Sequence, residues 1–114
     1  MLKPRFQAYL ALACYKTDHY DQAKKIINHI TSITNQPATG DPDYFAGWYY
    51  SGIGMVDSAF FWLEKAYKNR SIQLAWLKVD PVFKNLKADK RYLDLYEKTG
   101  HKAYDDYTNS VKNN

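Results

Sequence analysis

The sequence predicts a single all-helical domain over its 114 residues, and three observations lead to this prediction. Apolar and small residues recur every three or four positions and do not alternate, which is the period of a helix buried on one face. Asp-Pro pairs and glycines, the usual start and end signals of helices, separate these segments. Two helical hairpins also match each other at a constant offset of 36 residues, as from Ala11 to Gly47.

The first hairpin is predicted from Pro4 onward, because proline is favoured in the first turn of a helix. The first helix is expected over about 4–17. Asp18 is expected to cap a second helix over about 19–33. The residues that repeat with helical period in this second helix are Tyr20, Ala23, Ile26, Ile27, Ile30 and Ile33.

Turn-forming residues over 35–42 lead into the second hairpin. Asp41 followed by Pro42 is an N-cap with proline at the first helical position, so a third helix is expected over about 42–52. Gly52 and Gly54 indicate a tight corner. Asp57 is then expected to cap a fourth helix that ends near residue 69.

The remaining third of the chain is predicted to form four shorter helical segments. The first covers 71–77, and Asp80-Pro81 repeats the cap-plus-proline signal for a second over 81–87. Asp89 is expected to cap a third segment that runs to residue 98, where Thr99-Gly100 ends it. The last helix, over about 101–111, is amphipathic through Ala103, Tyr104, Tyr107 and Val111, and residues 113–114 are expected to fray.

Composition excludes several classes of protein. One cysteine and three scattered histidines provide neither a disulfide nor the spacing of a zinc site, so we expect no metal and no cofactor. The net charge of +4 is spread along the chain and does not form a stripe for nucleic acid. No apolar run reaches the roughly 20 residues that span a bilayer, and the first residues do not resemble a signal peptide, so a cytoplasmic protein is expected.

The residue types that carry catalysis are scarce, and the chain is expected not to be an enzyme. His19, His29 and His101 have no nucleophile or carboxylate at a spacing that predicts a pair, and Cys14 lies on an apolar helix face where a buried thiol is expected. Asp41 and Asp43 fit helix capping better than calcium binding. A series of basic residues with interleaved tyrosines follows residue 83, but acidic residues interrupt it, which favours a solvated helix pair over a nucleic-acid site.

The matched hairpins resemble the tetratricopeptide repeat, whose length is near 34 residues. The second hairpin carries the closer match, with small residues at the helix crossing and large ones in the next turn. Its motif positions are Ala46, Gly47, Tyr50, Gly54, Ala59, Leu63 and Ala66, while Asp43 stands where the family has tryptophan and Ser71 where it has proline. The first hairpin has Ala11 for the glycine and Cys14 for the aromatic residue.

Residues 57–100 resemble the C-terminal repeat region of bacterial multidomain regulators, in which repeats follow an adenylate cyclase, a Ser/Thr kinase or a winged-helix domain. The resemblance rests on residues 58–67, on Val79-Asp80-Pro81-Val82-Phe83-Lys84-Asn85-Leu86, and on Asp89-Lys90-Arg91-Tyr92. Lys90 replaces the second proline of the family segment, and Tyr92 replaces a phenylalanine.

These resemblances imply a short right-handed solenoid within one domain over 1–114. Repeat 1 would cover about 4–35, repeat 2 about 40–70, and helices over about 71–112 would cap the last apolar face, because two repeats alone are too few for stability. No cap is expected before Pro4. Either the chain is a part of a longer protein, at its C-terminal end, or the uncovered face of the first hairpin pairs with a second copy.

The tetratricopeptide resemblance also implies a groove that holds a peptide or protein segment. The groove positions carried over to this sequence are Arg5, Ala8, Leu12, Tyr15, Tyr44, Trp48 and Ser51, and Arg5 and Lys16 are candidates to bind a partner's carboxylate. The alternative is that Tyr44 and Trp48 pack between the repeats or under the tail.

The expected function is therefore protein–protein interaction, with a protein or peptide partner or a neighbouring domain of the same chain, inside a bacterial signalling or transcription regulator. The alternative is a structural module that forms a homodimer through the first hairpin. Light scattering separates the two expectations.

Overall fold

A computed structural model describes residues 3–33 and 41–112, and within these ranges the chain forms helices and turns and no strand. The prediction of an all-helical fold is confirmed. The predicted turn over 35–42 and the predicted fraying of 113–114 lie almost wholly outside the described residues. The elements are α1 (Pro4–Lys16), α2 (Tyr20–Ser32), α3 (Asp41–Gly52), α4 (Val56–Lys68), the 3-10 helices η1 (Ile72–Trp76) and η2 (Pro81–Leu86), α5 (Lys90–Lys98) and α6 (His101–Lys112).

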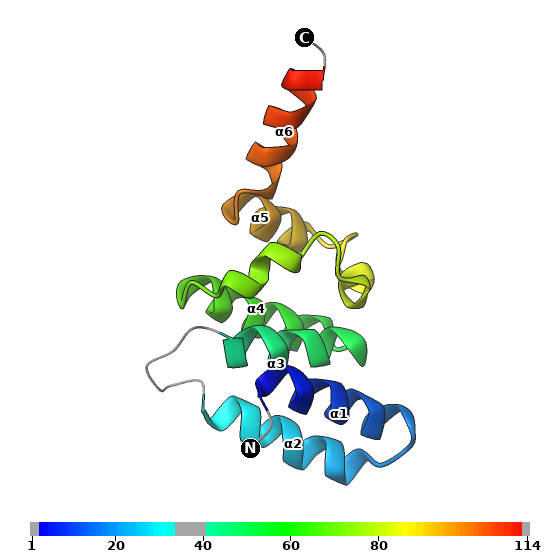
Figure 1. Cartoon of the computed structure of the whole chain (residues 1–114). Helices are drawn as coiled ribbons and strands as arrows, with labels where there is room; N and C mark the ends of the chain where they lie inside the picture. Colours follow the sequence, from blue (N-terminus) through cyan, green and yellow to red (C-terminus); the bar gives the residue numbers. More distant parts are fainter. Residues whose placement is uncertain (1–2, 34–40, 113–114) are drawn as a thin grey trace.

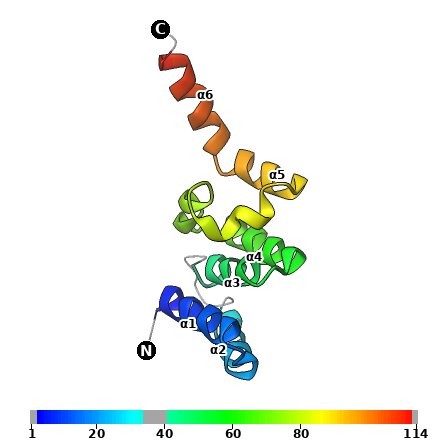
Figure 2. The ribbon, with the colours of Figure 1, turned by 90° about the vertical axis from the view of Figure 1, so that its right-hand side faces the viewer.

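The two hairpins are stacked on one another. Helix α1 packs against α2 and α3 against α4, and α3 lies on both helices of the first hairpin (Figure 1). The tail then covers the far side of the second hairpin, so the order along the long axis is first hairpin, second hairpin, tail and α6 (Figure 2). The molecule is elongated, with extents of 54 × 31 × 22 Å.

The turns inside the two hairpins have the same geometry at the offset of 36 residues. Asp18 and Gly54 both adopt the left-handed conformation, with φ of 67° and 82°. The amide of His19 donates to the Cys14 carbonyl at 2.8 Å, and the amide of Met55 donates to the Tyr50 carbonyl at 2.9 Å. The matched pattern in the sequence therefore corresponds to a matched backbone turn.

Two predicted caps are wrong. Asp18 does not cap α2: its φ of 67° places it inside the turn, His19 occupies the N-cap position, and the Asp18 carboxylate instead accepts a hydrogen bond from the Tyr20 hydroxyl. Asp57 does not cap α4, because that helix begins one residue earlier, at Val56. Asp57 instead pairs with Arg91 at 2.9 Å.

A glycine permits the close crossing of α3 and α4. A Cβ atom on Gly47 would lie 2.8 Å from Cγ of Leu63, which is shorter than van der Waals contact. At the matching position of the first hairpin, Ala11 is fully buried. Small residues thus stand at both crossings, as the pattern of the sequence predicts.

The tail differs from its prediction in helix type. The segments expected as helices over 71–77 and 81–87 are short 3-10 helices, η1 and η2. The caps were predicted correctly at Asp80, which accepts from the Val82 amide, and at Asp89, which accepts from the Arg91 amide. 3-10 helices are common as short connecting segments, and periodicity over five or six residues does not distinguish them from an α-helix.

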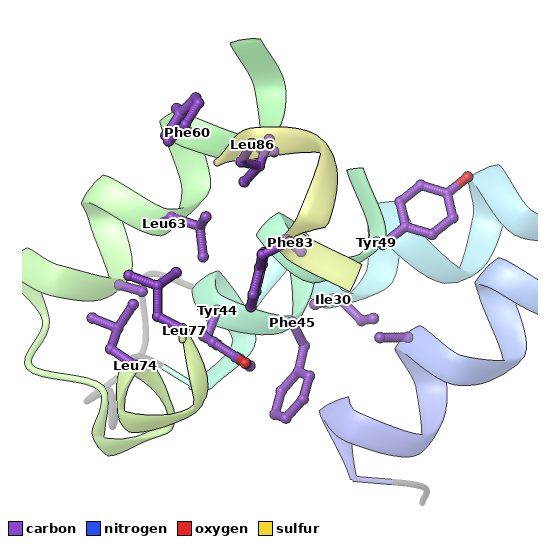
Figure 3. Packing of buried hydrophobic residues seen from close by; sticks show 14 of the residues in the cluster. Ile30, Tyr44, Phe45, Tyr49, Phe60, Leu63, Leu74, Leu77, Phe83 and Leu86 are labelled. Carbon is purple, nitrogen blue, oxygen red and sulfur yellow. The ribbon is translucent and has the colours of Figure 1, made fainter. Parts of the chain in front are cut away.

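The tail supplies much of the core over the second hairpin. Phe83 and Leu86 of η2, Leu74 of η1 and Leu77 just after it are buried against α3 and α4 (Figure 3). The ring of Phe83 meets that of Tyr44 edge to face at 5.7 Å. Buried residues of η1, η2 and α5 thus join the core beside α3 and α4. Helix α6 has no buried residue.

Candidate partner-binding cleft

Two of the predicted groove residues on α3 lie under the tail. Tyr44 is 1% exposed and Ser51 is fully buried. The Ser51 hydroxyl donates to the Val82 carbonyl at 2.6 Å, and the Asn85 amide donates to the Ser51 carbonyl at 3.4 Å. In this structure the chain's own segment 81–86 thus occupies the surface that the family resemblance assigns to a partner.

Asp80 fixes that segment to α3. One of its carboxylate oxygens accepts from the Val82 amide at 3.1 Å, which caps η2. The other accepts from the Trp48 indole at 3.1 Å and lies 3.5 Å from the Tyr44 hydroxyl. Burial raises the pKa of Tyr44, and the neighbouring Asp80 carboxylate raises it further. Trp48 is half-buried, so its main role in this structure is to hold the tail.

The predicted residues on α1 divide into two groups. Arg5 is exposed, donates to the side-chain oxygen of Gln73 at 3.3 Å and lies over the ring of Phe45 at 5.7 Å. Tyr15 lies ten residues further along α1, roughly 15 Å away, and Lys16 is next to it. Arg5 and Lys16 therefore do not converge on one carboxylate.

The other predicted positions on α1 and the Tyr15 ring serve packing. Ala8 is buried, and Leu12 packs against Gly52 and the core. Tyr15 is half-buried, with its ring 4.9 Å from that of Tyr20 and 6.4 Å from that of Tyr49.

An open cleft lies between the start of α1 and the tail, and we call it the Arg5 cleft. It has a volume of about 370 Å³. Its lining residues are Arg5, Tyr9, Tyr44, Phe45, Gln73, Trp76, Val79, Asp80 and Pro81. Two of these lining residues are large aromatic side chains exposed to solvent, Tyr9 at 46% and Trp76 at 55%.

A second hollow of about 350 Å³ continues on the other side of Arg5. It is shared by the first residues of α1 and α3, and Arg5, Phe45 and Gln73 line both hollows. Arg5 therefore lines both hollows, and its guanidinium group contacts the Phe45 ring and the Gln73 side chain.

Of the residues that line this cleft, the sequence predicts Arg5 and Tyr44 as binding residues but not Tyr9 or Trp76. Tyr9 follows Arg5 by four residues, so helical spacing alone places it on the same face, one turn away. Trp76 and Val79 come from the tail, more than sixty residues away, and only the folded position of η1 brings them to α1. No local pattern in the sequence carries that information.

Among the described residues that line the cleft, Tyr44 and Asp80 are titratable groups in contact, and both serve to hold the tail on α3. Nδ1 of His19 lies 2.9 Å from the Thr17 hydroxyl, and Nε2 of His101 lies 3.0 Å from the Leu74 carbonyl. Neither histidine lines the cleft. Among residues 3–33 and 41–112, no three His, Cys, Asp or Glu side chains are grouped to hold a metal ion. Over the same residues, no helix has the length and apolar character needed to cross a membrane.

Comparison with models of known protein families, with curated proteins and with solved structures found no match for this chain.

Proposed function

We propose that this chain is a non-catalytic protein-interaction domain and that it binds a segment of a partner protein in the Arg5 cleft. The observation that carries the proposal is the exposure of two aromatic side chains, Tyr9 and Trp76, in one cleft with Arg5. Tyr, Trp and Arg are the residue types that contribute most to binding energy at protein interfaces.

The cleft is preorganised, which lowers the entropic cost of binding. The Tyr9 ring rests on the Trp48 ring at 4.9 Å, and Trp48 is in turn bonded to Asp80. Arg5 is held by Gln73 and Phe45. Three walls of the cleft are thus set by contacts inside the domain before a partner arrives.

An extended peptide segment is the ligand we propose, because the cleft is open and is lined by both polar and apolar side chains. An aromatic or aliphatic side chain would lie between Tyr9 and Trp76, and a carboxylate or a backbone carbonyl would accept from Arg5. The resemblance to tetratricopeptide repeats and to the C-terminal region of bacterial regulators supports a cytoplasmic role in signalling or transcription control. The partner would then be another protein or a neighbouring domain of the same chain.

The experiment is quantitative capture of partners from an extract of the source cells. Three forms of the domain are compared: wild type, Trp76→Ala and a control, Phe61→Ala. Phe61 is 62% exposed on α4 and lines a different hollow, so its removal changes the exposed apolar area but not the Arg5 cleft. Trp48→Ala is a poor probe, because it also removes the bond between Trp48 and Asp80.

We expect Trp76→Ala to lose the proteins that wild type retains, and Phe61→Ala to keep them. All three forms should have the same helical circular dichroism and melting temperature, since both side chains are exposed. Equal capture by wild type and Trp76→Ala would reject the cleft as the binding site.

A homodimer through the first hairpin is the second candidate, and one observation favours it. The outer face of that hairpin exposes Phe6 and Leu10, beside a hollow of about 330 Å³ that also involves Ile26. Pairing of this face with a second copy would cover it. Leu10→Lys would place a charge in its centre and abolish such a dimer in light scattering.

A further inference from the structure

Most of the surface of helix α6 is not packed against the rest of the domain. It has 12 residues, none of them buried, and it projects from the body of the molecule (Figures 1 and 2). An isolated helix of this length is only marginally stable in water, and tertiary packing normally stabilises it. The body holds mainly its first half, where Asp105 accepts from Lys78 at 2.8 Å and from the Tyr96 hydroxyl.

One face of α6 is free of charge along its whole length. Residues at spacings of three and four form this uncharged stripe, which consists of Ala103, Tyr104, Tyr107, Ser110 and Val111. Tyr104 and Tyr107 are each 68% exposed. The charged pair Lys102–Asp106 lies on another side, with its atoms 3.0 Å apart. The stripe is therefore suited to a helix that presents no charge of its own.

The stripe continues into a groove at the base of α6. The groove has a volume of about 630 Å³ and lies between the end of α4, η1 and the turn from α5 to α6. Tyr67, Ile72 and Tyr104 line it, and Ile72 is 80% exposed. Arg70 also lines it, so the groove combines an apolar floor with a cationic rim. Tyr104 belongs to both surfaces and joins them into one patch.

We propose that α6 pairs with α6 of a second copy of this chain, antiparallel and across a two-fold axis. The uncharged stripes would face each other, and the end of each α6 would lie over the groove of the other copy. A two-fold interface uses the same patch twice and so requires a self-complementary patch. The groove lies at the base of α6 and the stripe runs from there to the end of the helix. In an antiparallel pair the end of one stripe therefore meets the groove of the other copy, which satisfies this requirement.

Helix direction and area both favour a second copy as the occupant. Antiparallel pairing opposes the two helix dipoles, which is the favourable arrangement, although Lys112 in the last turn of α6 offsets the partial negative charge of that end. Taking about 150–250 Å² for each aromatic side chain, the exposed parts of the stripe and of Tyr67 and Ile72 amount to on the order of 600 Å² per copy. Two copies would then bury about 1,200 Å² in total, which is the lower end of the range of about 1,200–2,000 Å² for specific interfaces.

This dimer uses neither the Arg5 cleft nor the outer face of the first hairpin. The proposal therefore goes beyond the proposed function, and either can fail without the other. A dimer through α6 would also place two Arg5 clefts in one particle, so that a partner with two binding segments would be held with increased avidity.

The test is light scattering coupled to gel filtration over concentrations up to about 1 mM. We expect wild type to reach twice the chain mass of 13.3 kDa. Tyr107→Lys places two like charges at the centre of the paired stripes and should raise the dissociation constant at least about 100-fold. Asn109→Lys adds the same charge to the same helix on the opposite side and should leave the dimer intact. At concentrations low enough for both variants to be monomeric, circular dichroism should show the same melting temperature for both, because α6 contributes no buried residue.

Each other outcome overturns the proposal. A wild-type monomer at all concentrations excludes the dimer, and a dimer that survives Tyr107→Lys excludes α6 as its interface. Loss of the dimer in Leu10→Lys but not in Tyr107→Lys assigns it to the first hairpin. A mass that grows beyond two copies indicates head-to-tail association and not a closed two-fold pair.

Discussion

Asp43 is the residue at which burial and charge conflict. Its side chain is fully buried in α3, where one oxygen accepts from the Asn69 amide at 2.7 Å. The other oxygen has no hydrogen-bond partner among the described residues. Burial raises the pKa of Asp43 above its ordinary 3.8, although the Asn69 bond and the charge of Lys65 act in the opposite direction. The ionised carboxylate is therefore less stable in the folded chain than in the unfolded chain.

Asp43→Asn should stabilise the domain by about 1 kcal/mol at pH 7, because the amide keeps the oxygen that Asn69 bonds and removes the buried charge. Because the pKa of Asp43 is higher in the folded chain than in the unfolded chain, Asp43 contributes most to the free energy of unfolding below pH 3.8. This contribution is lost as the pH rises through the folded pKa. The gain from Asn should thus be small at pH 3 and grow toward pH 7. Thermal unfolding of both forms across this range tests it, and a variant less stable than wild type at every pH would contradict it.

Asp80 and Asp89 form a matched pair of caps in different surroundings. Each accepts a hydrogen bond from the amide two residues later, at 3.1 Å and 2.9 Å. Asp80 also accepts from the half-buried Trp48, whereas Asp89 pairs with Arg91 at the surface. Loss of Asp80 would leave the Trp48 indole and the buried Tyr44 hydroxyl without their shared acceptor.

We therefore expect Asp80→Ala to cost about 2–4 kcal/mol and Asp89→Ala about 1 kcal/mol, since a lost cap costs about 1 kcal/mol and an unpaired buried donor about 1–3 kcal/mol more. Urea unfolding, followed by tryptophan fluorescence, gives both values. Equal losses for the two variants would show that Asp80 acts only as a cap and does not hold the tail on α3.

At the scale of elements, the two hairpin turns offer a direct comparison. Asp18 and Gly54 share a left-handed backbone, which costs a residue with a side chain roughly 1–2 kcal/mol and costs glycine nothing. A Cβ at Gly54 would meet no atom within 4 Å, so only the backbone conformation opposes it. The Asp18 side chain regains part of the cost through its bond with the Tyr20 hydroxyl.

Asp18→Gly should thus stabilise the domain slightly, by up to about 1 kcal/mol, and Gly54→Ala should destabilise it by about 1 kcal/mol. Differential scanning calorimetry of the two variants measures both changes. If both substitutions changed the stability of the domain in the same direction, the two turns would not be equivalent.

Gly47 tests the crossing of α3 and α4. Alanine is favoured over glycine inside a helix by about 1 kcal/mol, but here its Cβ would lie 2.8 Å from Leu63. Steric overlap in a packed core costs about 1–3 kcal/mol, so it should outweigh the helix preference. We expect Gly47→Ala to lower the melting temperature and the double variant Gly47→Ala/Leu63→Ala to lose less than the sum of its parts. A stabilising Gly47→Ala would contradict the close crossing.

The sequence was sufficient to predict the elements and insufficient to predict where the tail lies. The period of small and large residues located the four long helices to within a few residues, because burial of one face determines that period. The cap at Asp18 was predicted wrongly, since capping and the left-handed turn use the same residue types. Tyr44 and Ser51 were expected at a groove but are covered by residues 81–86, a contact between segments about thirty residues apart that no local pattern records.

At the scale of the molecule, the recognition surfaces that we propose lie where the stack of helices is left uncovered. The outer face of the first hairpin and the stripe of α6 lie at opposite ends of a 54 Å body, and the Arg5 cleft opens on its side. The tail fills the surface of α3 and at the same time supplies Trp76 to the cleft. The cleft therefore exists only while the tail is docked, and Asp80→Ala should weaken partner binding as well as stability.

The most direct test of partner binding in the Arg5 cleft is photo-crosslinking from position 76. A photoreactive phenylalanine derivative replaces Trp76 in one form and Phe61 in a second, and both are irradiated in the source cells. We predict a discrete adduct from position 76 that disappears when Arg5→Ala is added, and no matching adduct from position 61. The same adducts from both positions, or none from position 76, would contradict a partner site in this cleft.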